Sequence, residues 1–546
     1  MSRKQKSYLL ELNYIKFFFY LLPFTSFFFS LYQLNLQYDG HHHGVVYSVS
    51  EDFLSGKIPY KDFLPHYGIS FIVINSIFIK IFSDSIFGTY FLISLSKGII
   101  FLFFGMIIKK IFDEKIAISS MLMMFFLHPF VGTPWPDYLF FSLILISFYI
   151  LIISRNNFLF LISGFFYSIA GLTKDNLTIM LFLGIIFLFT YLFFLKHFKK
   201  KIILDNFINI YWIVGYSIPL LIFFLYLTHN SILYEYLNHW GIGKLAIQNF
   251  CISKVDLFAL RVFDCGIIAS KQLFIKSITK IFTQPYWLFF LLIIIANIFF
   301  IFNTFFFDKD KVINEKKKIM ILISFLSLIL FANTFYFLSV QKLFTGVAIG
   351  MIVLVYLIQN QKSAVNKFFI HCLFLAFLIN GIQLIRAPNQ LIYPSFTKKD
   401  YNESNNIKFL KFKKLSKHEW KQLNEFEILT NKVKNSCPLV NYSANITNDV
   451  FFRIILKQKY ELLNFIPFGP TNKFISEMIN KYDYKFYQKL NSKIDKKNIL
   501  IAVDETSKIN SKLKNNSSLY LVKSIQYYGY GTKFINIYLP INCKVI

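Results

Sequence analysis

One short stretch of the sequence, 38–68, gathers an acid, imidazoles, lysines and tyrosines between glycines. Its members are Asp39, His41, His42, His43, Lys57, Tyr60, Lys61, Asp62 and Tyr67. A carboxylate can take a proton from a reacting hydroxyl, and lysines or imidazoles can donate hydrogen bonds to a phosphate. Ionisable groups near a membrane boundary cost desolvation free energy unless they are paired or used. The stretch is therefore the first candidate for a reaction site.

The three histidines also allow other interpretations. Imidazole and carboxylate groups bind divalent metals, so a metal held by His42 and His43 is one alternative. Adjacent residues cannot all point to one ion without a special turn, and the histidines could equally be solvated loop residues. The sequence therefore makes no cofactor certain.

Two later segments carry further candidates, Asp137 within 134–137 and Lys174 with Asp175 within 171–176. Both acids could instead lie at helix starts, where they would stabilise exposed backbone amides. Simpler roles exist for the first stretch as well. Asp39 could cap a helix or pair with a lysine, and Lys57 could merely face solvent, as could Lys61.

The elements that position these residues follow from composition. The chain of 546 residues is 55% hydrophobic, has a mean hydropathy of +0.50 and contains 70 Phe. A membrane span needs roughly 20 apolar residues, so the runs predict a polytopic α-helical membrane protein with about eleven spans. The predicted spans are 14–36, 87–108, 116–130, 138–153, 158–172, 177–195, 207–227, 287–307, 319–340, 343–357 and 368–385.

Lysine and arginine clusters set the predicted orientation, because cytoplasmic loops carry an excess of basic residues. With the N-terminus in the cytoplasm, the clusters at 109–115, 155, 196–201, 309–318 and 362–367 all fall on the cytoplasmic side. This assignment requires that 69–82, which is short for a span, lies along the membrane or re-enters it. The segments 38–68, 134–137 and 171–176 then share the exterior face.

The predicted organisation has two parts. Residues 1–388 form the membrane part, with exterior loops at 37–86 and 229–284. Residues 389–546 form an exterior soluble α/β domain, which begins with a polar, lysine-rich connection at 389–427. Alternation and apolar runs predict the strands 439–442, 499–503, 519–524 and 534–539 and the helices 450–457 and 473–490.

The net charge of +29 does not indicate a nucleic-acid partner, because no motif for binding nucleic acids accompanies it. Anionic membrane lipids and topology explain a basic balance. The five cysteines have no metal-binding spacing and are expected mostly to be packing residues. Cys251 and Cys265 share one exterior loop, so a disulfide between them is an alternative.

The exterior residues resemble those of a known family, the GT-C membrane glycosyltransferases related to protein mannosyltransferases and the lipid A aminoarabinose transferase. In that family an acid follows the first helix, and bacterial members often continue with paired histidines, Gly-x-x-Pro-Tyr-x-Asp and Tyr-Gly. A second element has Gly-Leu, Lys and an acid at the exterior end of a helix. The matching residues are Asp39, His42, His43, Gly44, Gly56, Pro59, Tyr60, Asp62, Tyr67, Gly68, Gly171, Leu172, Lys174 and Asp175.

The resemblance implies a GT-C-like fold and a transfer of sugar from a polyprenyl-phosphate donor to a lipid or glycan acceptor, in the periplasm at a bacterial inner membrane. Asp39 would then be the general base, and Lys57, Lys61 or Lys174 would bind the donor phosphate. Protein mannosyltransferases usually have an Asp-Glu pair in this loop, whereas Gly40 follows Asp39 here. A protein acceptor is therefore not expected.

Two other functions stay open at this stage. A transporter or flippase of a lipid-linked glycan should place charges at mid-membrane depth, and Lys97 is the best such residue. A glycan polymerase or ligase would differ from the transferase mainly in the sizes of its donor and acceptor.

Overall fold

The structure is a computed structural model, and it describes most of the helical part and about half of the C-terminal part. The described residues are 3–36, 38, 40, 42–63, 65, 67–127, 133–174, parts of 181–193, 209–234, 236–237, 285–306, 314–334, 344–345, 347–359, 401–403, 407–437, 443–445, 450–459, 500–505, 508–526 and 534–543. The predicted span 368–385, strand 439–442 and helix 473–490 lie outside them.

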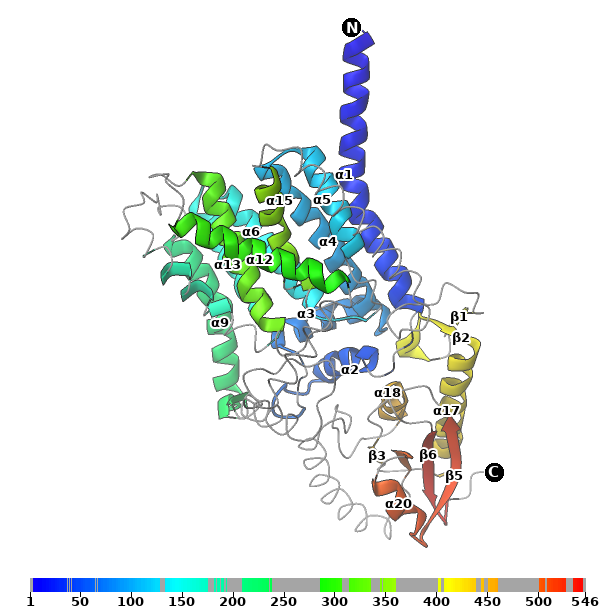
Figure 1. Cartoon of the computed structure of the whole chain (residues 1–546). Coiled ribbons are helices and arrows are strands. Elements are labelled where there is room, and N and C mark those ends of the chain that lie inside the picture. Colours follow the sequence, from blue (N-terminus) through cyan, green and yellow to red (C-terminus); the bar gives the residue numbers. More distant parts are fainter. Residues whose placement is uncertain are drawn as a thin grey trace.

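Apolar helices form the N-terminal part of the chain, and they pack into one bundle (Figure 1). Each overlaps one of the apolar runs in the sequence, because a helix satisfies all its backbone hydrogen bonds internally in an apolar solvent. The helices are α1 Arg3–Leu36, α4 Phe87–Ile111, α5 Glu114–Leu127, α6 Asp137–Ile153, α7 Asn157–Gly171, α9 Ile210–His229, α12 Pro285–Phe306, α13 Glu315–Thr334 and α15 Met351–Gln359, with the short 3-10 helix η1 Ala348–Gly350 before α15.

Three helices among the described residues are long and apolar enough to cross a membrane. They are Lys16–Leu36, Phe87–Ile111 and Ile210–His229. Large apolar side chains lie exposed on the outer surface, such as Phe24 on α1 and Leu221 on α9. A lipid environment would cover these side chains, so the bundle has the surface of a membrane protein. The count of about eleven spans stays a prediction.

Helices α1 and α4 run antiparallel. About halfway along α1, the centroid of the Phe19 ring lies 5.2 Å from the Nζ of Lys109, which is near the end of α4. Farther along, the Ser94 hydroxyl donates to the Ser30 hydroxyl at 3.3 Å. The chain between the two helices therefore leaves and re-enters the bundle at one end, opposite to the lysines that end α4. We call this the loop end.

Two short helices, α2 His42–Leu54 and α3 Ile69–Ile81, lie at the loop end (Figure 1). The Asn75 amide of α3 donates to the Ser50 hydroxyl of α2 at 2.9 Å. Just before α3, the Gly68 amide donates to the Thr173 carbonyl after α7, and just beyond it the Ile86 amide donates to Phe409. Both ends of α3 therefore lie at the loop end. That 69–82 does not cross the membrane stays a prediction.

The C-terminal region, 401–543, contains a four-stranded sheet of order β3-β4-β6-β5. Strands β3 and β4 are parallel, whereas β4 with β6 and β5 with β6 are antiparallel. The elements are β1 Tyr401–Glu403, η2 Lys408–Leu410, β2 Lys414–Ser416, α17 Lys417–Ser436, β3 Ser443–Asn445, α18 Val450–Lys459, β4 Ile501–Asp504, α20 Lys508–Lys514, β5 Leu519–Gln526 and β6 Phe534–Pro540. Strands β4, β5 and β6 and helix α18 overlap predicted elements. A separate exterior α/β domain at 389–546 stays a prediction.

The expectation of a polar connection at 389–427 was wrong for its described second half. Helix α17 begins there with a capping box, in which the Ser416 hydroxyl accepts from the Glu419 amide and the Glu419 carboxylate accepts from the Ser416 amide. Its apolar side chains Leu423, Phe426 and Val433 are buried. Their spacing of three and seven places them on one face, which the lysines around them concealed.

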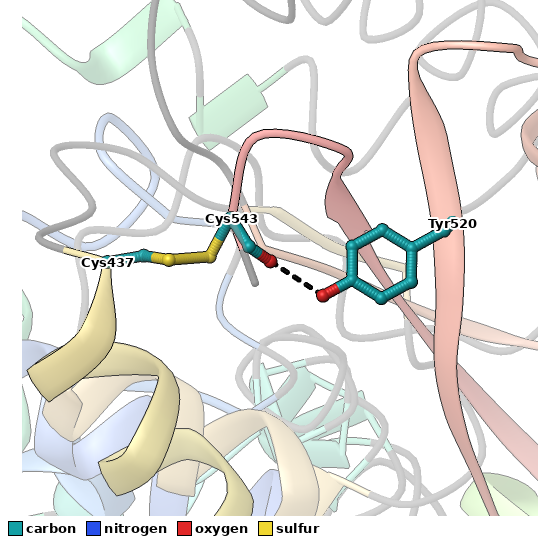
Figure 2. The surroundings of a disulfide bond; sticks show 3 residues. All are labelled: Cys437, Tyr520 and Cys543. Carbon is teal, nitrogen blue, oxygen red and sulfur yellow. Dashed lines mark hydrogen bonds between the residues drawn. A yellow bond between two sulfur atoms is a disulfide. The ribbon is translucent and has the colours of Figure 1, made fainter. Parts of the chain in front are cut away.

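A disulfide joins Cys437, just after α17, to Cys543, just after β6 (Figure 2). The Tyr520 hydroxyl of β5 donates to the Cys543 carbonyl at 2.6 Å. The expectation that the cysteines are mostly packing residues was wrong for this pair, because 106 residues separate the two in sequence and only the fold brings them together. Cys251 and Cys265 lie outside the described residues.

Candidate active site

The loop that follows α1 is held by the C-terminal region. The Gly40 carbonyl accepts from the Val450 amide at 3.1 Å, and the Tyr38 ring packs against Phe451 with centroids 5.5 Å apart. Asp39, the expected base, lies outside the described residues, although both of its neighbours are described. The loop of the expected base is therefore anchored on α18.

The adjacent residues His42 and His43 have different surroundings. The His42 ring lies at the surface of α2, 4.9 Å from the Trp135 ring. His43 is fully buried, and its Nδ1 lies 2.7 Å from the Tyr90 hydroxyl of α4. The two rings do not converge, and no group of three metal-binding side chains occurs in the part of the chain that the structure describes. The described geometry thus gives His43 a packing role and leaves His42 beside the Trp135 segment.

Asp137 and Lys174 meet in a buried ion pair at the loop end. Asp137 begins α6, Lys174 follows α7, and the Oδ2 and Nζ atoms are 2.5 Å apart. The two side chains are 3% and 13% exposed, so the pair is largely removed from water. Sequence analysis placed both residues at one face but did not predict that they pair. Asp175 lies outside the described residues.

Lys57 and Lys61 differ in their surroundings. The Lys57 Nζ lies 2.9 Å from the Oδ1 of Asp52 on α2, whereas Lys61 is exposed. The Asp62 carboxylate accepts a hydrogen bond from the Ile58 amide at 2.7 Å, and this bond closes the turn 58–62. Of the two lysines, Lys57 lies nearer to α2, and Asp62 has a structural role in its turn.

Two tyrosines connect this loop to the bundle. Tyr60 is buried with a positive φ of 70°, and its ring lies 5.0 Å from that of Tyr236 beyond α9. Tyr67 is buried and packs edge-on against Phe71 of α3 at 5.4 Å. A positive φ is uncommon for a tyrosine, so packing must hold Tyr60 in this conformation. Both tyrosines fix the loop against the helices.

Gly68 joins the first loop to the segment after α7. A Cβ at this position would lie 2.2 Å from the Leu172 carbonyl oxygen and 2.8 Å from the Lys174 nitrogen, both backbone atoms. Gly68→Ala should therefore lower the free energy of unfolding by about 1–3 kcal/mol, as overpacking does. Chemical denaturation in detergent measures this loss. Gly56→Ala is the comparison for backbone strain alone: its Cβ would have no atom within 4 Å, but its φ of +82° should cost an alanine about 1 kcal/mol. A loss in Gly68→Ala smaller than that in Gly56→Ala would contradict the role of the close contact.

Three residues of the candidate site were not predicted from the sequence. Asp52 and Glu51 on α2 both contact Lys457 of α18, and burial raises the pKa of the Glu51 carboxyl above its ordinary value while Lys457 opposes that shift. Lys413, fully buried, donates to the Leu34 and Asn35 carbonyls at the end of α1. Glu51 and Asp52 are adjacent acids in the loop 37–86, and this could have drawn attention to them. Lys413 lies within 389–427, which was expected to be only a connection.

Comparisons at the level of sequence find no relative. No protein-family model matches the chain, and no curated protein matches it. Comparison of structures does find solved structures with a similar fold, among them that of ArnT, in agreement with the resemblance of the loops to the GT-C family.

The structures that establish this fold are two crystal structures of ArnT from Cupriavidus metallidurans. The one in the apo state aligns with a TM-score of 0.54 and 10% identity, covering 98% of each chain. The one bound to undecaprenyl phosphate aligns with the same TM-score and identity, covering 95% of this chain and 97% of that one. A structure of an oligosaccharyltransferase from Archaeoglobus fulgidus, in complex with Zn and sulfate, aligns with a TM-score of 0.48 and 11% identity, covering 88% of this chain and 68% of that one.

Proposed function

We propose that this protein is a glycosyltransferase that moves a sugar from a polyprenyl-phosphate donor to an envelope acceptor. The observation that carries the proposal is the convergence at the loop end of His42, Trp135, Asp137, Lys174 and Gly68, which lie at or beside the ends of α2, α6, α7 and α3. The shared fold adds support, because one ArnT structure with that fold is bound to undecaprenyl phosphate.

The reaction needs a base and a site for the leaving phosphate. An acceptor hydroxyl would attack the anomeric carbon, its proton would pass to Asp39, and the bond from that carbon to the phosphate oxygen would break. Positive groups would stabilise the phosphate that leaves. Lys57, Lys61 and Lys174 are the proposed donors to it, with His42 as a further candidate. Lys57 and Lys174 are paired with carboxylates in the structure.

The proposed location is the periplasmic face of a bacterial inner membrane. The lysines at the end of α4 lie opposite the loop end, as cytoplasmic lysines should if the loop end faces outward. The disulfide between Cys437 and Cys543 lies in the C-terminal region, and disulfides persist in oxidising compartments such as the periplasm. Both features favour an exterior loop end with the N-terminus in the cytoplasm.

Transport of a lipid-linked glycan is the second candidate function, and Lys97 is the observation that favours it. Lys97 is buried within α4, and its Nζ lies 4.3 Å from the centroid of the Tyr138 ring. Tyr138 follows Asp137 directly, so this charge is packed beside the candidate site rather than along a separate path. A polymerase or ligase would use the same site with a larger donor and acceptor.

Purified protein in lipid nanodiscs should transfer radiolabel from a polyprenyl-phosphate sugar to an extract of envelope acceptors. The same sugar on a nucleoside diphosphate is the control donor and should give no transfer, because the proposed site takes its donor from the bilayer. Movement of the labelled donor across a liposome bilayer without transfer would instead support the transporter. Absence of both activities with every polyprenyl-phosphate sugar tried would contradict the proposal.

A further inference from the structure

Helix α18 of the C-terminal region lies next to α2 of the first loop (Figure 1). Val450 and Lys457 are two helical turns apart on α18, and Gly44 and Glu51 are two turns apart on α2. Val450 contacts Gly44, and Lys457 contacts Glu51. The two helices therefore contact each other at two places, which lie two turns apart on each helix.

The first contact lies near the described residues that flank the expected base in the sequence. A Cβ on Gly44 would lie 2.5 Å from the Cβ of Val450, so a side chain at Gly44 would push the helices apart. The Gly40 carbonyl accepts from the Val450 amide, and Tyr38 packs against Phe451. The described residues on either side of Asp39 thus both touch the start of α18.

The second contact is an ionic one at the far end of α2. The Lys457 Nζ lies 3.3 Å from the Glu51 carboxylate and also bonds the carboxylate of Asp52. The three side chains are at least four-fifths buried. Asp52 also accepts from Lys57. Without Lys457, two neighbouring buried carboxylates would share the single cation Lys57 within this cluster, and their repulsion would disfavour the packed position of α2.

We propose that Lys457 is a positioning residue: from the C-terminal region it holds the acid pair of α2, so that α2 and the loop before it keep the position that transfer requires. The inference rests on the proposed function for its effect on rate. Its structural part, the clamp of α18 on α2, is independent of any substrate. The C-terminal region then completes the site instead of only adjoining it.

The test compares full-length Lys457→Met with Lys523→Met in lipid nanodiscs. Lys523 forms a partly exposed ion pair with Glu425 at 3.1 Å within the C-terminal region. Lys523→Met therefore removes a lysine–carboxylate pair by the same substitution, but at a place that does not contact α2. Hydrogen exchange of the α2 amides should become about tenfold faster or more in Lys457→Met only. The rate constant kcat should fall on the order of 100-fold, with the KM for the polyprenyl-phosphate sugar within about twofold, as misplacement of a reacting group does.

Lys457→Arg, which retains the charge, should keep α2 protection close to that of the wild type and restore most of kcat. Unchanged exchange of α2 in Lys457→Met would overturn the clamp, and so would an equal increase in Lys523→Met. Faster exchange confined to α2 with an unaltered kcat would overturn the positioning role. If the wild-type protein transfers no sugar, the proposed function fails and the positioning role fails with it, while protection of α2 still decides whether the clamp exists.

Discussion

Asp39→Asn should lower the rate of sugar transfer on the order of 100-fold or more, with little change in the KM for the donor. The amide retains the size and hydrogen-bonding capacity of the carboxylate but cannot accept the proton of the acceptor, and general-base catalysis typically contributes this much. The initial rate of label transfer by the purified protein measures the effect. Because Tyr38 and Gly40 anchor the loop on α18, the substitution should leave the fold intact.

Asp113→Asn is the matched control for that substitution. Asp113 is exposed at the end of the bundle opposite the loop end, where its carboxylate accepts from the Ile116 amide at 2.8 Å and caps α5. Asparagine makes the same cap, so both stability and transfer should stay at the wild-type level. Full activity of Asp39→Asn would remove Asp39 as the base, and equal losses in both variants would indicate a general effect of lost charge.

Breaking the buried ion pair of Asp137 and Lys174 should cause the largest loss of stability among the variants proposed. In Lys174→Met the carboxylate of Asp137 stays buried without its cation, which costs about 3–5 kcal/mol of unfolding free energy in comparable pairs. Chemical denaturation of the protein in detergent micelles measures the loss. Lys109→Met is the control, because its pair with Glu114 is partly exposed and such pairs contribute roughly 0–1 kcal/mol.

A double variant separates the structural role of Lys174 from binding of the donor. Asp137→Asn together with Lys174→Met removes both charges, so most of the lost stability should return. If Lys174 also binds phosphate, the stable double variant should still bind undecaprenyl phosphate at least tenfold more weakly than the wild type. Wild-type binding by the double variant would restrict Lys174 to a structural role. A double variant as unstable as Lys174→Met would contradict the ion-pair account.

The sequence predicted much of the framework for a simple reason. Long apolar runs in a bilayer have few options besides helices, so the long apolar helices that the structure describes in the N-terminal part overlap predicted runs. Alternation in the C-terminal part likewise predicted the strands seen as β4, β5 and β6. Helix α17 was missed because its buried face carries few apolar residues and its surface is rich in lysine. The stability of such a polar helix depends more on tertiary packing of its one apolar face than on helix propensity.

The sequence by itself determined which residues share the loop end, because the order of helices and the positions of basic clusters constrain the face on which each loop lies. It could not determine which of those residues touch. The pairing of Lys174 with Asp137, the contact of Lys457 with the acids of α2 and the disulfide of Cys437 with Cys543 were decided by tertiary structure. Each joins groups far apart in sequence, and pairing in space depends on how the helices and the C-terminal region pack, which no local pattern encodes.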